Sequence, residues 1–150
     1  MLEIKALSRR DEELWAKTAM YAENCSWQTT GEYLSKQMKN QEFSDWERVF
    51  AAVENGDIAG FCTLSKTSSV FRDLPVPILG FVFVGEPYRG NQISRQLCLS
   101  AIEYAKTVGF DQVYLYSDLH NFYEKYGFVK IDEKEAPWGV KQSIYVHATK

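Results

Sequence analysis

The stretch "ILGFVFVGEPYRGNQIS", residues 78–94, decides the fold. Its first seven residues are almost continuously apolar, which predicts a strand that is buried on both faces. A helical pattern follows from about Asn91 to Val108, because apolar residues recur on one stripe of that segment and Gly109 can end it. A buried strand that turns directly into an amphipathic helix is typical of an α/β fold.

The join between this strand and this helix has two interpretations. The first N–H groups of a helix are unpaired and together carry about half a positive charge, so they can bind an anion. Gly90 removes one Cβ from the turn, and Arg89 adds a full positive charge. Residues 89–94 hold a single glycine, however, and match neither of the common glycine-rich phosphate loops. Composition alone therefore favours an ordinary strand-to-helix connection.

The other segments complete the α/β pattern. Asn55-Gly56 lies between two β-type runs, 48–53 and 58–64, and predicts a hairpin. Residues 65–77 contain Pro75 and Pro77 and are expected to form a loop. One helix is expected at 11–22, a second begins at a capping box at 29–32, and a short third is expected at 121–126. Further strands are expected at 2–7, 112–117, 128–132 and 142–147. This order predicts one domain, residues 1–150, with a mixed sheet.

Composition restricts the classes of partner. Hydrophobic residues make up 45% of the chain and charged residues 25%, as in an ordinary folded domain, and a net charge of −3 predicts no nucleic-acid partner. No apolar run approaches the length of a membrane span and no signal peptide is apparent, so we expect no membrane partner and a cytoplasmic location. The widely spaced Cys25, Cys62 and Cys98 suit reduced, buried thiols and no metal.

Two motifs resemble those of the GNAT superfamily of acyl-CoA-dependent N-acyltransferases. "RGNQIS", residues 89–94, is similar to the family's Q/R-x-x-G-x-G/A loop, and "FYEKYGF", residues 122–128, to its (F/L)-Y-x-x-x-G-F segment. The resemblance covers about residues 78–132. It implies a mostly antiparallel central sheet of six to seven strands with helices on both faces. It also implies acetyl-CoA as co-substrate and transfer of the acetyl group to a primary amine.

The resemblance also assigns residues to the cofactor. The pyrophosphate of coenzyme A would bind the amides of Arg89, Gly90, Asn91, Gln92, Ile93 and Ser94, and the pantetheine would lie along the strand that ends at Phe83 and Val84. Gln92 and Ser94 stand where the family has glycine and glycine or alanine. A Cβ at these two positions hinders close approach of a pyrophosphate unless the backbone keeps a negative φ.

The same resemblance makes Tyr123 the general acid that protonates the departing CoA thiolate, since a tyrosine stays protonated at neutral pH. Helical spacing alone instead favours a core tyrosine. The base that accepts the amine proton is not identified. Asp118 and His120 follow a strand at the end where α/β sheets bind ligands, but Asp118 equally suits a helix cap.

The acceptor pocket is expected near the N-terminal helices. Trp27, Tyr33 and Trp46, with Glu23 and Glu32 nearby, could hold a cationic amine, although core packing explains such aromatic residues as well. The acceptor itself, a small molecule or a peptide amine, stays open, as does a homodimer paired through the C-terminal strands. The alternative function is a non-catalytic acyl-CoA-binding or regulatory module on the same fold.

Overall fold

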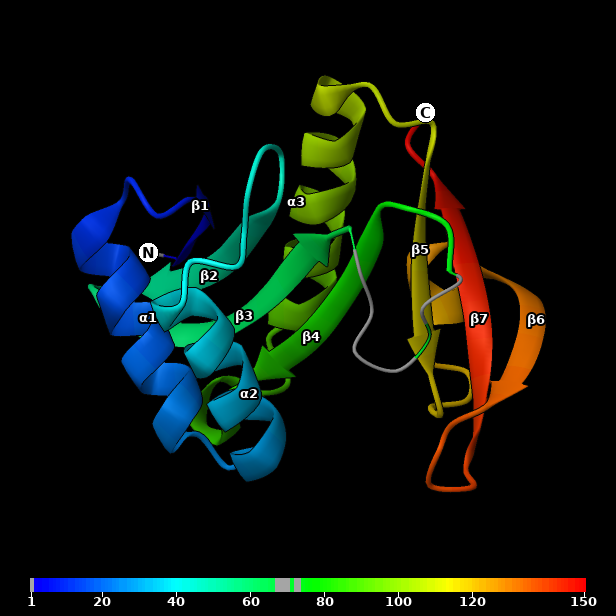
Figure 1. Ribbon diagram of the computed structural model, residues 1–150, viewed down its shortest axis with the longest axis horizontal. Coiled ribbons are helices and arrows are strands. Elements are labelled where there is room, and N and C mark those ends of the chain that lie inside the picture. Colours follow the sequence, from blue (N-terminus) through cyan, green and yellow to red (C-terminus); the bar gives the residue numbers. More distant parts are fainter. Residues whose placement is uncertain (1, 67–70, 72–73) are drawn as a thin grey trace.

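The structure is a computed structural model that describes residues 2–66, 71 and 74–150. Its strands form one seven-stranded sheet in the order β1-β2-β3-β4-β5-β7-β6 (Figure 1). All neighbouring strands are antiparallel except β4 and β5. The strands are β1 (Leu2–Leu7), β2 (Arg48–Glu54), β3 (Asp57–Ser65), β4 (Ile78–Val84), β5 (Gln112–Ser117), β6 (Val129–Glu135) and β7 (Lys141–Ala148). The expected fold class is confirmed.

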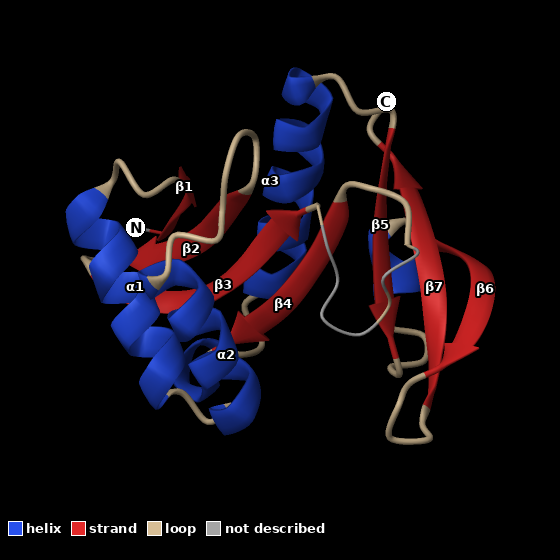
Figure 2. Ribbon diagram, in the orientation of Figure 1, coloured by secondary structure: helices blue, strands red, loops and turns tan. Residues whose placement is uncertain are grey.

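Helices cover both faces of the sheet. α1 (Glu12–Asn24) and α2 (Gln28–Lys39) pack on one face, and α3 (Ile93–Val108) lies on the other (Figure 2). Each side has its own hydrophobic core. On the α3 side, Leu97, Ala101 and Ala105 are fully buried among residues of β2, β3, β5 and β7. This is the stripe that the sequence predicts for the helix.

The predicted hairpin is present between β2 and β3. Asn55 and Gly56 adopt φ values of 51° and 87°, as a two-residue turn with both central residues left-handed requires. The prediction that Pro75 and Pro77 lie outside the strands is also confirmed, because β3 ends at Ser65 and β4 begins at Ile78. Residues 67–70 and 72–73 of the predicted loop lie outside the described residues.

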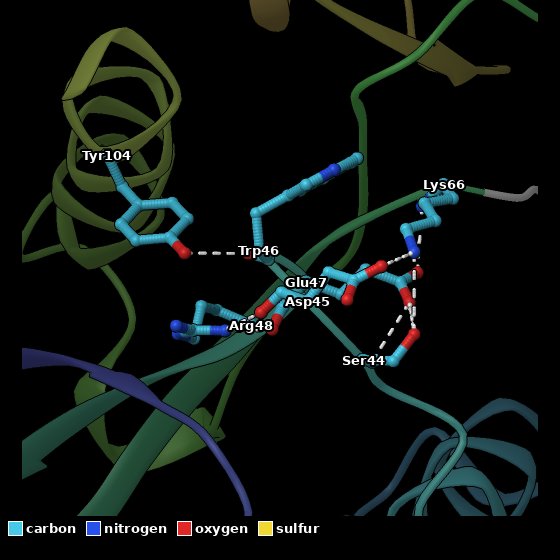
Figure 3. A network of polar contacts seen from close by, with 7 residues as sticks. All are labelled: Ser44, Asp45, Trp46, Glu47, Arg48, Lys66 and Tyr104. Atoms are coloured by element: carbon cyan, nitrogen blue, oxygen red, sulfur yellow. Dashed lines mark hydrogen bonds and ion pairs between the residues drawn. The ribbon is translucent and has the colours of Figure 1, made fainter. Parts of the chain in front are cut away.

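The segment that leads into β2 is held by a polar network (Figure 3). The buried carboxylate of Glu47 accepts hydrogen bonds from the backbone N–H of Ser44, at 3.1 Å, and from that of Lys66, at 2.8 Å. The Tyr104 hydroxyl of α3 donates to the carbonyl of Trp46 at 2.7 Å. These bonds tie β2 to the end of β3 and to α3, and they give Glu47 a structural role.

The sheet opens between β4 and β5. One register pair, Ile78 with Tyr114, joins the described residues of these two strands, and beyond it the strands diverge (Figure 1). A register shift against β3 marks a bulge in β4, where Phe81 adopts a φ of 51°. The prediction that residues 78–84 are buried on both faces is therefore wrong in the middle of the strand: residues 80–82 are only partly buried beside the opening.

Three predicted element starts need correction. α3 begins at Ile93 rather than Asn91, because Gly90 and Gln92 both have positive φ and break the helical pattern before it. α2 begins at Gln28 with Trp27 at its N-cap and no side-chain cap hydrogen bond, so the expected capping box at 29–32 is wrong. The predicted helix at 121–126 is the short 3₁₀-helix η2 (Tyr123–Tyr126).

Candidate active site

The opening between β4 and β5 holds a cavity of about 520 Å³. Its walls come from residues 82–84 of β4, from the loop and first turn of α3, and from Phe122 and Tyr123 before and in η2. Trp27, at the start of α2, and Leu119, after β5, also line it. Ligand sites in α/β folds lie at such points, where the strand order leaves a crevice at the carboxyl ends of the strands.

The turn before α3 presents main-chain groups to this cavity. A short 3₁₀-helix, η1 (Glu86–Tyr88), follows β4, and Gly90 comes after it with a φ of 87°. An added Cβ at Gly90 would meet nothing within 4 Å, so the space beside that backbone is open. The N-cap of α3 is Gln92, whose side chain makes no cap hydrogen bond. The first N–H groups of this 16-residue helix are therefore available to an anion.

Arg89 closes the loop onto the end of β4. Its Nε donates to the carbonyl of Val84 at 2.9 Å, and its guanidinium lies 5.7 Å from the centre of the Phe83 ring. The residue is exposed, so its remaining N–H groups face solvent. Arg89, Gly90, Gln92, Ile93 and Ser94 line the cavity, as do Phe83 and Val84, whereas Asn91 does not and instead donates to the Tyr88 carbonyl at 3.2 Å.

Ser94 connects the cavity's two walls. Its hydroxyl lies 2.7 Å from the Tyr126 hydroxyl, which joins the first turn of α3 to η2. The carbonyl of Tyr126 is in turn 3.1 Å from Nε2 of His147 in β7. The sequence assigned Ser94 to the cofactor only, and no local pattern predicts its contact with a residue 32 positions later.

Tyr123 belongs to the core and to the cavity at once. It is 7% exposed and packs against Phe122, Phe128 and Tyr145, with ring centroids 4.9, 5.9 and 6.2 Å away. Burial, followed by the nearby thiols of Cys98 and Cys62, raises the pKa of Tyr123 well above its ordinary value. The hydroxyl is therefore protonated at neutral pH. The ring packs as that of a core tyrosine does, and the residue also lines the cavity, where a general acid is expected.

Neither residue considered as a base lines the cavity. Asp118 and His120 are both exposed, and their side chains lie outside the cavity walls. Asp118 does not cap η2 either, since the N-cap of η2 is Phe122. Among the described residues, no group of three or more His, Cys, Asp or Glu side chains is placed to hold a metal ion. None of the described helices is long and apolar enough to cross a bilayer.

The structure separates the residues expected around the acceptor. Trp27 lines the cavity and Tyr33 stacks on Phe81 of β4, but Trp46 lies on the other side of the sheet and packs on Phe110. Glu23 is ion-paired with Lys39 at 3.1 Å and borders a different cavity between α1 and α2. Glu32 is exposed and lines neither this cavity nor the one between α1 and α2. The aromatic side chains and the carboxylates thus do not form the one pocket that the sequence suggested.

A model of the acetyltransferase (GNAT) family matches residues 9–128. The chain belongs to this family. Membership supports acyl transfer from coenzyme A to an amine-like acceptor. No curated protein matches the chain significantly.

Solved structures of GNAT proteins share the fold. Aminoglycoside 6'-acetyltransferase type Ii has a TM-score of 0.78 at 17% identity, over 99% of this chain and 97% of that one. An aminoglycoside 6'-N-acetyltransferase complexed with coenzyme A has a TM-score of 0.76 at 15% identity, with the same coverage. A mutant spermidine N-acetyltransferase from Vibrio cholerae has a TM-score of 0.65 at 14% identity, over 99% and 94%.

Proposed function

We propose that this GNAT protein is an acetyl-CoA-dependent N-acetyltransferase that acts on a primary amine in a ternary complex. The observation that carries the proposal is the single cavity in which the end of β4, the turn before α3 and Tyr123 meet. Each of these three parts suits a different portion of an acyl-CoA: a strand edge for pantetheine, free helix N–H groups for pyrophosphate, and a hydroxyl for the sulfur.

The residues present fit the cofactor. Past Ile78, β4 has no ladder partner among the described residues of β5, so its peptide groups on that side can pair with the amides of pantetheine. The open space beside Gly90 lets a phosphate approach the backbone, and Arg89 adds a positive charge at the same turn. Asn91 is the exception among the residues assigned to the cofactor, because it points to Tyr88 rather than into the cavity.

Acetyl-CoA supplies an activated acetyl group, and the chain positions the two reactants. The nitrogen of a neutral amine bonds to the acetyl carbon, the carbon–sulfur bond breaks, and the nitrogen gives up one proton. We assign Tyr123, which lines the cavity, as the general acid that donates a proton to the departing sulfur. Because a buried phenolate is costly, the hydroxyl must regain its proton from solvent before the next turnover. With Asp118 and His120 outside the cavity, we assign the proton from the amine to water.

Calorimetric titration with acetyl-CoA tests the first half of the proposal. We expect saturable binding to the whole chain in the micromolar to millimolar range. Arg89→Ala should weaken it about 10-fold, through loss of one charge-assisted contact. A matched control is Arg48→Ala, because Arg48 caps the segment before β2 and does not line the cavity. No heat of binding at millimolar acetyl-CoA would contradict the proposal.

The second candidate function is a non-catalytic acyl-CoA-binding module. Gln92 favours it, because a side chain at a φ of 59° stands where the family motif has glycine. Binding of acetyl-CoA without acetyl transfer to any member of a broad amine panel would support this candidate over the enzyme. A cytoplasmic location and a homodimer remain predictions.

A further inference from the structure

Trp27 forms the open end of a stack of aromatic rings. Its indole lies 5.9 Å from the Phe83 ring at an interplanar angle of 19°, and Phe83 stacks in turn on the fully buried Phe61 at 5.3 Å and 24°. Trp27 nevertheless keeps 40% of its surface exposed and lines the cavity. Trp27 therefore brings an exposed part of its indole to the cavity, supported by the buried rings of Phe83 and Phe61.

Trp27 stacks on Phe83, but helix capping does not account for a tryptophan at this position. It is the N-cap residue of α2, a position where Ser, Thr, Asp or Asn stabilises a helix by accepting a backbone hydrogen bond. Trp27 makes no such bond, and its ring is only partly buried. Packing on Phe83 thus leaves part of the Trp27 ring exposed at the cavity, where a bound molecule can contact it.

A second stacked pair continues this surface along α2. Tyr33 is 46% exposed and stacks on Phe81, at 6.1 Å and 22°. Phe81 and Phe83 are two residues apart on β4, on either side of the bulge, and both pack in the core on the α1 and α2 side. In both pairs β4 supplies the inner ring and α2 or its N-cap supplies the exposed one. The aromatic surface thus extends from the cavity along the face of the sheet that α1 and α2 cover.

The charges around this surface disfavour a polycation. Arg89 is the one charged side chain among the described residues that line the cavity, and the proposed function assigns it to the CoA pyrophosphate. Glu42 and Glu47 border a separate cavity of about 60 Å³ beyond Phe81. Glu47 already accepts two backbone hydrogen bonds there. A substrate with several ammonium groups would find no carboxylate among these cavity walls.

We propose that the acceptor is an aromatic monoamine whose ring lies on Trp27, with its amine directed toward the thioester beside Tyr123. Trp27 is then the residue that determines acceptor specificity. The proposal rests on the proposed acetyltransferase function and adds the substrate class. The interaction we propose is stacking of the substrate ring on the Trp27 indole, in the offset geometry that Trp27 and Phe83 already adopt.

An amine panel with acetyl-CoA tests the substrate class on the whole chain. We expect kcat/KM for 2-phenylethylamine and tryptamine to exceed that for spermidine and for an aminoglycoside by about 10-fold or more. 2-Cyclohexylethylamine, of similar size but without a π-face, should fall between them. A preference for spermidine or the aminoglycoside would overturn the proposal while leaving the acetyltransferase function in place.

Variants of Trp27 test the residue. Trp27→Ala should raise KM for 2-phenylethylamine about 10-fold, while KM for acetyl-CoA and kcat/KM for n-propylamine stay within about 2-fold. Trp27→Phe keeps a ring and should recover most of the loss, which excludes a folding defect as the cause. Trp138→Ala, at a 60% exposed tryptophan in the turn between β6 and β7, is the matched control and should change none of these values. Equal effects of Trp27→Ala on the aromatic and the small amine would overturn the role of Trp27.

A binding measurement separates failure of this proposal from failure of the function. Saturation-transfer NMR should detect 2-phenylethylamine on the CoA-loaded protein, and the signal should disappear in Trp27→Ala. If no panel member is acetylated, the acetyltransferase function fails. The NMR signal then shows whether the aromatic site exists without turnover, and its absence in the native chain would overturn the site as well.

Discussion

The two halves of the sheet, β1 to β4 and β5 to β7, differ in how they are packed. In the first half, β2 and β3 lie between helices on both faces, and residues 58–64 of β3 are all buried. In the second half, β6 is almost entirely exposed, and Val129 and Ile131 keep 61% and 53% of their surface. α3 packs under both halves and is the element they share. The cavity lies where they meet, so each wall is held in place by its own half and by α3.

The largest expected effect concerns Tyr123, which the thinly packed half contributes to the cavity. Tyr123→Phe should lower kcat by about 10²–10³-fold, because general acid catalysis is lost, and should leave acetyl-CoA affinity within about 2-fold. Tyr104→Phe is a matched control, since its hydroxyl bonds only to the Trp46 carbonyl, outside the cavity. Steady-state kinetics and calorimetry on both variants check this prediction. An unchanged kcat in Tyr123→Phe would remove the residue from the mechanism.

A smaller effect concerns Cys98, in the part of α3 that supports both halves. Burial raises the pKa of the Cys98 thiol to about 12, whereas the unfolded thiol titrates near 9. Between these values the unfolded chain has released its proton and the folded chain has not. The free energy of unfolding therefore falls as pH rises from about 9 to 12, by up to about 1.4 kcal/mol per pH unit from this group. Below that window Cys98 adds no pH dependence.

Urea unfolding at pH 8 and pH 10.5 measures this slope. Cys98→Ala should be less stable than the native chain at pH 8, since it removes a fully buried side-chain atom. It should lose less stability than the native chain between the two pH values, because it lacks the Cys98 thiol. Removal of Cys98 should also lower the raised pKa values of Tyr123 and Cys62, which acts in the same direction. Equal slopes in the two proteins would show that the Cys98 thiol is not held in its protonated form by folding.

The smallest expected effect concerns Gln92, at the rim of the densely packed half. Gln92→Gly should stabilise the chain by about 0.5–1 kcal/mol, because glycine adopts a φ of 59° without a Cβ penalty. That corresponds to a rise in melting temperature of about 1–4 °C. Coenzyme A affinity should not fall, because the backbone donors remain and the Cβ that hinders the pyrophosphate at a positive φ is removed. Gly90→Ala is the reverse test and should destabilise, although an added Cβ has open space, because its φ of 87° disfavours any side chain.

Much of the fold could be predicted from periodicity and turn residues. The apolar run at 78–84, the stripe of α3 and the Asn55-Gly56 turn each carry their structure in a few adjacent positions. The start of α2 could not be predicted, because the capping box pattern at 29–32 is a local preference that the packing of Trp27 on Phe83 overrides. Likewise, the bulge at Phe81 depends on pairing with β3 and not on the sequence of β4 alone.

The candidate site was predictable where main chain and motif define it. Seven of the eight residues assigned to the cofactor line the cavity with Tyr123; Asn91 does not. Which aromatic residues and carboxylates meet was not predictable, because it depends on tertiary packing. Trp46 lies on the other side of the sheet from Trp27, and Glu23 borders a different cavity. The bond between Ser94 and Tyr126 joins two motifs that the sequence could name only separately.

The opening in the sheet has a consequence for how such a protein can change over time. A donor recognised by the edge of β4 and by the amides before α3 depends on backbone direction, and most side chains there can be replaced without loss of the contact. An acceptor recognised by exposed rings such as Trp27 depends on side chains, which single substitutions alter. Single substitutions can therefore change which amine is bound while acetyl-CoA binding is retained. We expect related chains to differ first at position 27.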